Sequence, residues 1–178
     1  TVSPSHNPSR LPWAPPLIGV GLFLAAQLLT LLQPEAIAHD VEELYNAAHA
    51  RLIQGGHLGD ILTLQYRGHC GGCTINALLG AGLFGIFGPT LFAWKTVPIL
   101  FQGVAALAAC RWIQERAGIA GVAIFTSILV FPPPAWLELS LVAWGNHMEA
   151  GAAAIIMVCV IDWTQKNPTP RRSLFCGL

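Results

Sequence analysis

The chain has 178 residues, of which 54% are hydrophobic and only 10% are charged, and its formal net charge is zero. A soluble domain of this size carries roughly a quarter charged residues, because it must cover its core with a solvated surface. The composition therefore predicts a membrane protein and excludes a disordered chain. Nine basic residues are balanced by nine acidic ones, so no basic excess is left for phosphates and we expect no nucleic-acid partner.

Four charge-poor segments are candidates for crossing the membrane, at about 20 residues for each crossing. We predict spans at residues 15–33, 90–110, 117–131 and 147–165. The first begins at a pair of prolines, which are tolerated best in the first turn of a helix. Ala36-Ile37-Ala38, just after it, also resembles a signal-peptidase site. Because the chain continues through this site, we interpret the segment as an uncleaved helix.

A fifth apolar segment, Thr74 to Phe87, is only 14 residues long, contains three glycines and ends before Gly88-Pro89. A segment of that length is typical of an interfacial helix. Basic residues in short loops collect on the cytoplasmic side, and here they occur around Arg10, around Arg111 and Arg116, and beyond Lys166. All three groups lie on one side only if Thr74 to Phe87 does not cross. We therefore predict a cytoplasmic amino terminus and an outer loop at residues 34–88.

The outer loop opens with a pattern that predicts a helix. Asp40 and Glu43 form a D-x-x-E capping box, and apolar residues follow at helical spacing: Val41, Leu44, Tyr45, Ala48 and Leu52. We interpret this as an amphipathic helix on the membrane surface. The predicted fold is thus all-α: one transmembrane domain over residues 1–178, with about four transmembrane helices and an outer loop of interfacial amphipathic helices. Ser173 to Leu178 looks like the start of a further apolar segment, so we expect the chain to continue.

Several residues of the outer side have both a structural and a chemical interpretation. Asp40, Glu42 and Glu43 are either cap residues near a positive helix end or general bases for an acceptor outside the first span. Five of the six histidines fall on the same side, but they lack metal-ligand spacing. We therefore predict no metal and no other cofactor, with a divalent metal as the alternative.

Cys70-Gly-Gly-Cys73 is the sharpest local motif, and it lacks both the histidine of a haem-attachment site and a second C-x-x-C for zinc. We expect a disulfide or free thiols in an oxidising outer compartment. A metal site ranks below these, and redox catalysis ranks last.

Three ionisable residues lie within predicted spans: Asp162 near the inner end, and Lys95 and Glu149 nearer the outer end. Such groups are costly in a membrane and are candidates for function, although placement at the interface explains them equally well. Gly145-Asn-His-Met-Glu149 adds an amide, an imidazole and a carboxylate within five residues, a density that is unusual for a purely structural turn.

Three segments together resemble the amino-terminal half of membrane-embedded C-superfamily glycosyltransferases and, more narrowly, uncharacterised bacterial relatives of that group. The segments are the acidic helix from His39 to Gly56, an F-G-P-x-L-x-x-x-[KR]-x-x-P element at Phe87 to Pro98, and a W-G-N-H-x-E element at Trp144 to Glu149. The resemblance covers residues 15–178. It implies transfer of a sugar from a polyprenyl-phosphate carrier to an acceptor outside a bacterial inner membrane.

The resemblance also implies roles for individual residues. Asp40 falls on the catalytic position, with Glu42 or Glu43 as substitutes. Lys95 and Arg67 would neutralise the lipid phosphate, and Asn146, His147 and Glu149 would bind the sugar. The partners would be membrane lipids and the lipid-linked sugar. The alternative is a non-catalytic subunit that keeps this scaffold and packs against other transmembrane subunits through the small residues 151–154.

Overall fold

A computed structural model describes residues 12–33, 40–57, 73–145 and 147–166 of the chain. These residues form helices and no strands, which confirms the all-α prediction. The helices are α1 (Ala14–Leu31), α2 (Val41–Gln54), α3 (Cys73–Phe87), α4 (Leu91–Val130), α5 (Pro134–Ser140) and α6 (Met148–Lys166). Of these, α1, α4 and α6 are long and apolar enough to cross a membrane.

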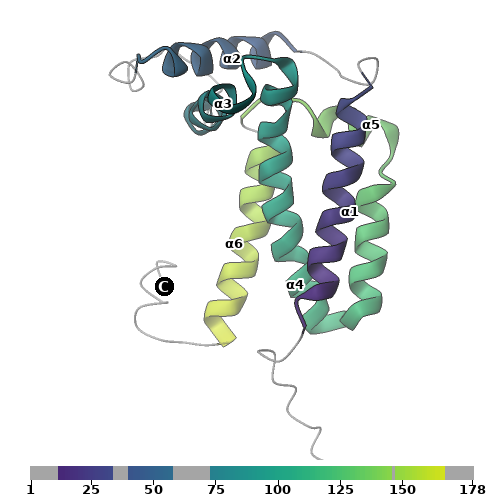
Figure 1. The fold of residues 1–178 in the computed structure, drawn as a ribbon. Helices are drawn as coiled ribbons and strands as arrows, with labels where there is room; N and C mark the ends of the chain where they lie inside the picture. The colour runs from purple at the N-terminus through teal and green to yellow at the C-terminus, as the bar shows by residue number, and fades with distance from the viewer. Residues whose placement is uncertain (1–11, 34–39, 58–72, 146, 167–178) are drawn as a thin grey trace, which may run out of the picture.

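The three long helices form an upright bundle, and α2 and α3 lie side by side across one of its ends (Figure 1). We call this the α2 end. The segment Thr74 to Phe87, predicted to be interfacial, forms α3 and does not run along the bundle axis (Figure 1).

Helix α4 is 40 residues long and reverses direction at Gly118, where φ is 67° and ψ is −163°. This backbone conformation is essentially restricted to glycine. The first limb, residues 91–117, descends through the bundle, and the second, residues 119–130, returns beside α1 (Figure 1). The predicted break between residues 110 and 117 is therefore wrong: the helix continues through Arg111 and Arg116 and turns two residues later. We call the opposite end of the bundle the Gly118 end.

The bundle core joins α1 to both limbs of α4. Val20 and Phe23 of α1 pack against Ala106 and Cys110 of the first limb and Val122 of the second. Partly buried leucine, isoleucine and phenylalanine side chains extend this cluster. Where helices cross a membrane, close van der Waals packing holds them together rather than the displacement of water, so this cluster joins the two limbs to α1.

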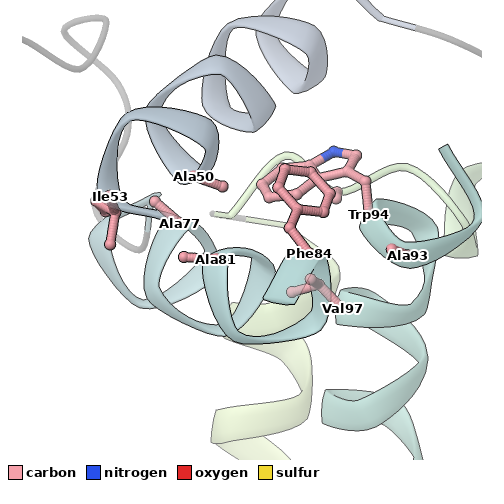
Figure 2. Close-up of a cluster of buried hydrophobic side chains, with 9 residues drawn as sticks. Ala50, Ile53, Ala77, Ala81, Phe84, Ala93, Trp94 and Val97 are labelled. Atoms are coloured by element: carbon pink, nitrogen blue, oxygen red, sulfur yellow. The ribbon is translucent and has the colours of Figure 1, made fainter. Parts of the chain in front are cut away.

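A second core lies beneath α2 and joins it to α3 and the start of α4 (Figure 2). Its largest member is Trp94, which is 1% exposed and lies near Phe84 with ring centroids 6.2 Å apart. Trp94 fits because Gly80 of α3 faces it: a Cβ at Gly80 would lie 2.5 Å from Cζ3 of the indole. The close approach of α3 to α4 therefore needs a residue without a side chain.

Helix α5 is tied to the bundle through one serine. The Gln102 amide of α4 donates a hydrogen bond to the Ser140 carbonyl oxygen at 2.6 Å, and the Gln27 amide of α1 lies 3.5 Å from the Ser140 hydroxyl oxygen. Because α5 follows the second limb of α4, these contacts bring the segment after it, residues 141–145, to the α2 end.

Candidate functional site at the α2 end

Asp40 is the N-cap of α2. Its backbone is extended, and its Oδ1 accepts a hydrogen bond from the backbone N–H of Glu42 at 2.7 Å. This confirms the structural interpretation of Asp40, because an N-cap side chain satisfies one of the unpaired N–H groups at the helix start. The side chain stays half-buried, so it also remains within reach of a molecule that docks at this end.

Glu43 has a different role from the one predicted. Its Oε2 forms an ion pair with Lys95 Nζ at 2.7 Å, and both side chains have zero exposure. Its Oε1 accepts a hydrogen bond from the backbone N–H of Ala143 at 3.1 Å. The capping box is therefore wrong in its second half, because the Glu43 carboxylate turns into the protein instead of back to Asp40. Glu43 and Lys95 join α2, α4 and the segment 141–145 at one buried point.

The faces of α2 are reversed relative to a soluble surface helix. Its buried face includes the polar residues Glu43, Asn46 and His49, and its exposed residues include the predicted apolar stripe: Val41, Leu44, Tyr45, Ala48 and Leu52. Burial lowers the pKa of the His49 imidazole, and a hydrogen bond with the Tyr45 backbone opposes this effect. The helix is thus held to the protein through these polar groups as well as through Ala50 and Ile53 of the second core, and presents much of its apolar surface outward.

The segment of the W-G-N-H-x-E element lies against α2 and α3. The Asn46 amide donates a hydrogen bond to the Trp144 carbonyl oxygen at 3.2 Å, and Cys73 Sγ lies 3.4 Å from the same oxygen. Gly145 follows with φ of 85°, and a Cβ at this position would lie 3.0 Å from Cys73 Sγ and 3.2 Å from its backbone. The turn can therefore approach the start of α3 only with glycine at this position.

Glu149 lies at the head of α6 and is 5% exposed. Its Oε1 accepts a hydrogen bond from the Asn76 amide of α3 at 2.7 Å. The neighbouring His147 ring makes an edge contact with Trp144, with centroids 4.9 Å apart. Glu149 thus connects the start of α6 to α3, just as Glu43 connects α2 to α4.

Cys73, at the first position of α3, is disulfide-bonded. Cys70, the partner that the C-x-x-C motif predicts, lies outside the described residues, so this pairing stays a prediction. Arg67 and Asn146, two of the predicted substrate-binding residues, also lie outside them. Among the described residues there is no group of three or more His, Cys, Asp or Glu side chains that could hold a metal ion.

A cavity of about 230 Å³ opens beside this site, between α1, both limbs of α4, α5 and α6. Its walls are mostly apolar, with Gln102, Trp136 and His147 as the residues that carry hydrogen-bonding groups. Of the predicted site residues, His147 lines this cavity, and Lys95 and Glu43 do not.

Three residues of the site were missed by sequence reasoning: Asn46, Asn76 and Ala143. Asn76 carried a usable signal, because an amide within a charge-free apolar segment must find a partner when it is buried. Asn46 lies three residues after Glu43 and so shares its helix face. Ala143 contributes only its backbone N–H, and no side-chain pattern reveals such a contact.

No protein-family model, curated protein or solved structure matches this chain.

Proposed function

We propose that the chain is the membrane-embedded, amino-terminal part of a glycosyltransferase that takes a sugar from a polyprenyl-phosphate carrier on the outer side of a bacterial inner membrane. The supporting observation is the convergence of three segments at one point. Glu43 of the acidic helix contacts Lys95 of the F-G-P element and Ala143, directly before the W-G-N-H-x-E element. These segments are distant in sequence, and they are the ones that carry the resemblance.

In this proposal the chain crosses the membrane four times, through α1, the two limbs of α4, and α6. The α2 end lies outside. The basic residues Arg111, Arg116 and Lys166 gather at the Gly118 end, where they pair with Glu115 and Asp162. Cytoplasmic loops are enriched in such residues, which supports an inner location for this end.

The geometry divides the proposed roles among the acidic residues. Asp40 is the candidate general base, because it is half-buried at the bundle end and can face an acceptor. Glu43 is a positioning residue, since its carboxylate is fully buried against Lys95. The paired Lys95 also has no surface to offer a lipid phosphate, which leaves Arg67 for that role. His147 faces the cavity from which a sugar would be bound.

Asp40→Asn is the variant that tests the proposal, and Glu42→Gln, two residues later in the first turn of α2, is the matched control. Asparagine caps a helix as well as aspartate does, so the fold is preserved while the base is lost. We expect transfer to fall by about a hundredfold or more in Asp40→Asn and to change little in Glu42→Gln.

The assay uses membranes from cells whose chromosomal copy carries each variant. They are supplied with a panel of undecaprenyl-phosphate-linked radiolabelled hexoses, and loss of label from the lipid fraction is measured. Equal rates in Asp40→Asn and wild type would remove Asp40 from catalysis. The enzyme proposal itself would be contradicted if wild-type membranes turned over none of the donors faster than membranes from a deletion strain.

One observation favours the non-catalytic alternative. Helix α6 buries only Glu149, Ala152 and Thr164, and the small residues Gly151, Ala153 and Ala154 are exposed. Small exposed residues let another transmembrane helix approach closely. Under this alternative, native mass spectrometry of gently solubilised protein detects a stoichiometric complex, and the complex is lost in Ala154→Leu while donor turnover is absent.

A further inference from the structure

A second groove lies far from the proposed active site, at the Gly118 end. It has a volume of about 310 Å³ and runs between the first limb of α4 and α6. Its apolar part is formed by side chains such as Val104, Leu107 and Val160. Both flanking helices are long and apolar enough to cross a membrane, and in the four-crossing arrangement proposed above the groove opens toward lipid.

Toward the Gly118 end, the lining of the groove changes from apolar to aromatic and charged. Trp13, Trp112 and Trp163 line it there, and Trp13 and Trp163 are each about half exposed. Tryptophan is enriched at the membrane–water boundary, where its ring lies at the level of the headgroups. The three indoles therefore place this end of the groove at the depth of the lipid headgroups, with the apolar part extending toward the acyl chains.

Both signs of charge line the same end. Arg111 supplies the positive charge, and its guanidinium lies 4.7 Å from the centre of the Trp13 ring. Glu115 and Asp162 supply two carboxylates. These groups are paired at present. Arg111 Nε lies 3.5 Å from Glu115 Oε1, Lys166 Nζ lies 3.2 Å from Glu115 Oε2 and 2.9 Å from Asp162 Oδ2, and Arg116 also pairs with Asp162. All of these side chains are partly exposed, and such pairs contribute at most about 1 kcal/mol, so a ligand can exchange with them.

We propose that this groove binds phosphatidylethanolamine, with one acyl chain along the apolar walls. Its phosphate meets Arg111, and its primary ammonium donates hydrogen bonds to Glu115 and Asp162. A headgroup that carries both charges offers an anion to Arg111 and a cation to the two carboxylates. Phosphatidylglycerol can pair with Arg111 but brings no cation for the two carboxylates that line the groove, and the quaternary ammonium of phosphatidylcholine has no N–H to donate.

Lipid binding is measured by native mass spectrometry of delipidated protein titrated with dioleoyl phosphatidylethanolamine, phosphatidylglycerol or phosphatidylcholine. We expect one phosphatidylethanolamine to bind about fivefold more tightly than either other lipid. Equal affinity for the three lipids would overturn the proposal.

Two variants locate the site. Val104→Trp fills the groove from an exposed position, and Leu100→Trp, one turn earlier on the same helix, is exposed but does not line it. The preference should be lost in Val104→Trp and kept in Leu100→Trp, with circular dichroism confirming the fold. In Asp162→Asn the preference should shift toward phosphatidylglycerol, because one of the two carboxylates that would accept hydrogen bonds from the ammonium is removed. A preference that survives both Val104→Trp and Asp162→Asn would place the lipid elsewhere.

Discussion

Asp40 and Glu43 are three residues apart, yet their carboxylates lie in opposite surroundings. Asp40 precedes the first helical turn and caps it from the surface. Glu43 is on the inner face of α2, where Lys95 neutralises it and the Ala143 N–H satisfies its second oxygen. A buried carboxylate is tolerated only with such partners. Of the two residues, only Asp40 therefore remains accessible for chemistry.

The buried ion pair between Glu43 and Lys95 predicts how the stabilities of single and double variants compare. Removing one partner, in Glu43→Met or Lys95→Met, should cost about 3–5 kcal/mol because the other charge stays buried and unpaired. The double variant should be more stable than either single one, and should keep a deficit of about 1–3 kcal/mol from the unsatisfied Ala143 N–H. Thermal unfolding midpoints in detergent micelles measure this order. Additive losses in the double variant would show that the two charges are not coupled.

His49 predicts how stability depends on pH. Burial holds the pKa of His49 below its ordinary value, so the unfolded chain takes up a proton more readily than the folded one. Stability from this residue is complete above the ordinary pKa of about 6.5 and is lost as the pH falls below it. The drop in midpoint between pH 7.5 and 5.5 should be smaller in His49→Gln than in wild type. The exposed His57 provides the control, and an equal drop in His49→Gln and His57→Gln would contradict this role.

At the scale of elements, the helices could be predicted more accurately than their contacts. The predicted first and last spans, 15–33 and 147–165, differ from α1 and α6 by one or two residues at each end, because prolines and charges mark their limits. The turn in α4 was misplaced for a physical reason. Arg111 and Arg116 indicate which end of the bundle they occupy, but Gly118 decides where the backbone can reverse. Arg116 and Glu115 of α4 form ion pairs with Asp162 and Lys166 of α6 while the backbone of α4 stays helical.

The connection between α3 and the segment before α6 depends on Gly145. Alanine at this position must adopt a positive φ and also meets Cys73. Gly88 is the matched control, because its φ is 78° and nothing lies within 4 Å of an added Cβ. We expect Gly88→Ala to cost about 1–2 kcal/mol, and Gly145→Ala to cost a further ~1–3 kcal/mol for the steric clash. Unfolding midpoints compare the two variants, and equal losses would show that the turn relaxes away from α3.

At the scale of the whole molecule, composition predicted a membrane protein, and the structure has three helices long and apolar enough to cross. The convergence at the α2 end could not be predicted from spacing. It depends on a fully buried ion pair between residues 52 positions apart in the chain and on a backbone N–H 100 positions from its acceptor. Local patterns determine which residues are helical, but only the packed bundle determines which helix ends meet.

The lipid site requires that the Gly118 end lies at the depth of the lipid headgroups, and the proposed function requires that the two ends of the bundle lie on opposite sides of the membrane. Val41 of α2 and Arg116 of α4 report on this, because both are exposed and α3 lies between them in the chain. If α3 does not cross, Val41 is outside and Arg116 is inside. If α3 crosses, both lie on the same side.

The most direct measurement is labelling of Val41→Cys and Arg116→Cys in intact spheroplasts with a membrane-impermeant maleimide, with the unsubstituted chain as background. We predict that Val41→Cys reacts in intact spheroplasts and that Arg116→Cys reacts only after the membrane is permeabilised. Reaction of both residues from the outside would contradict the four-crossing arrangement and the separation of the two sites.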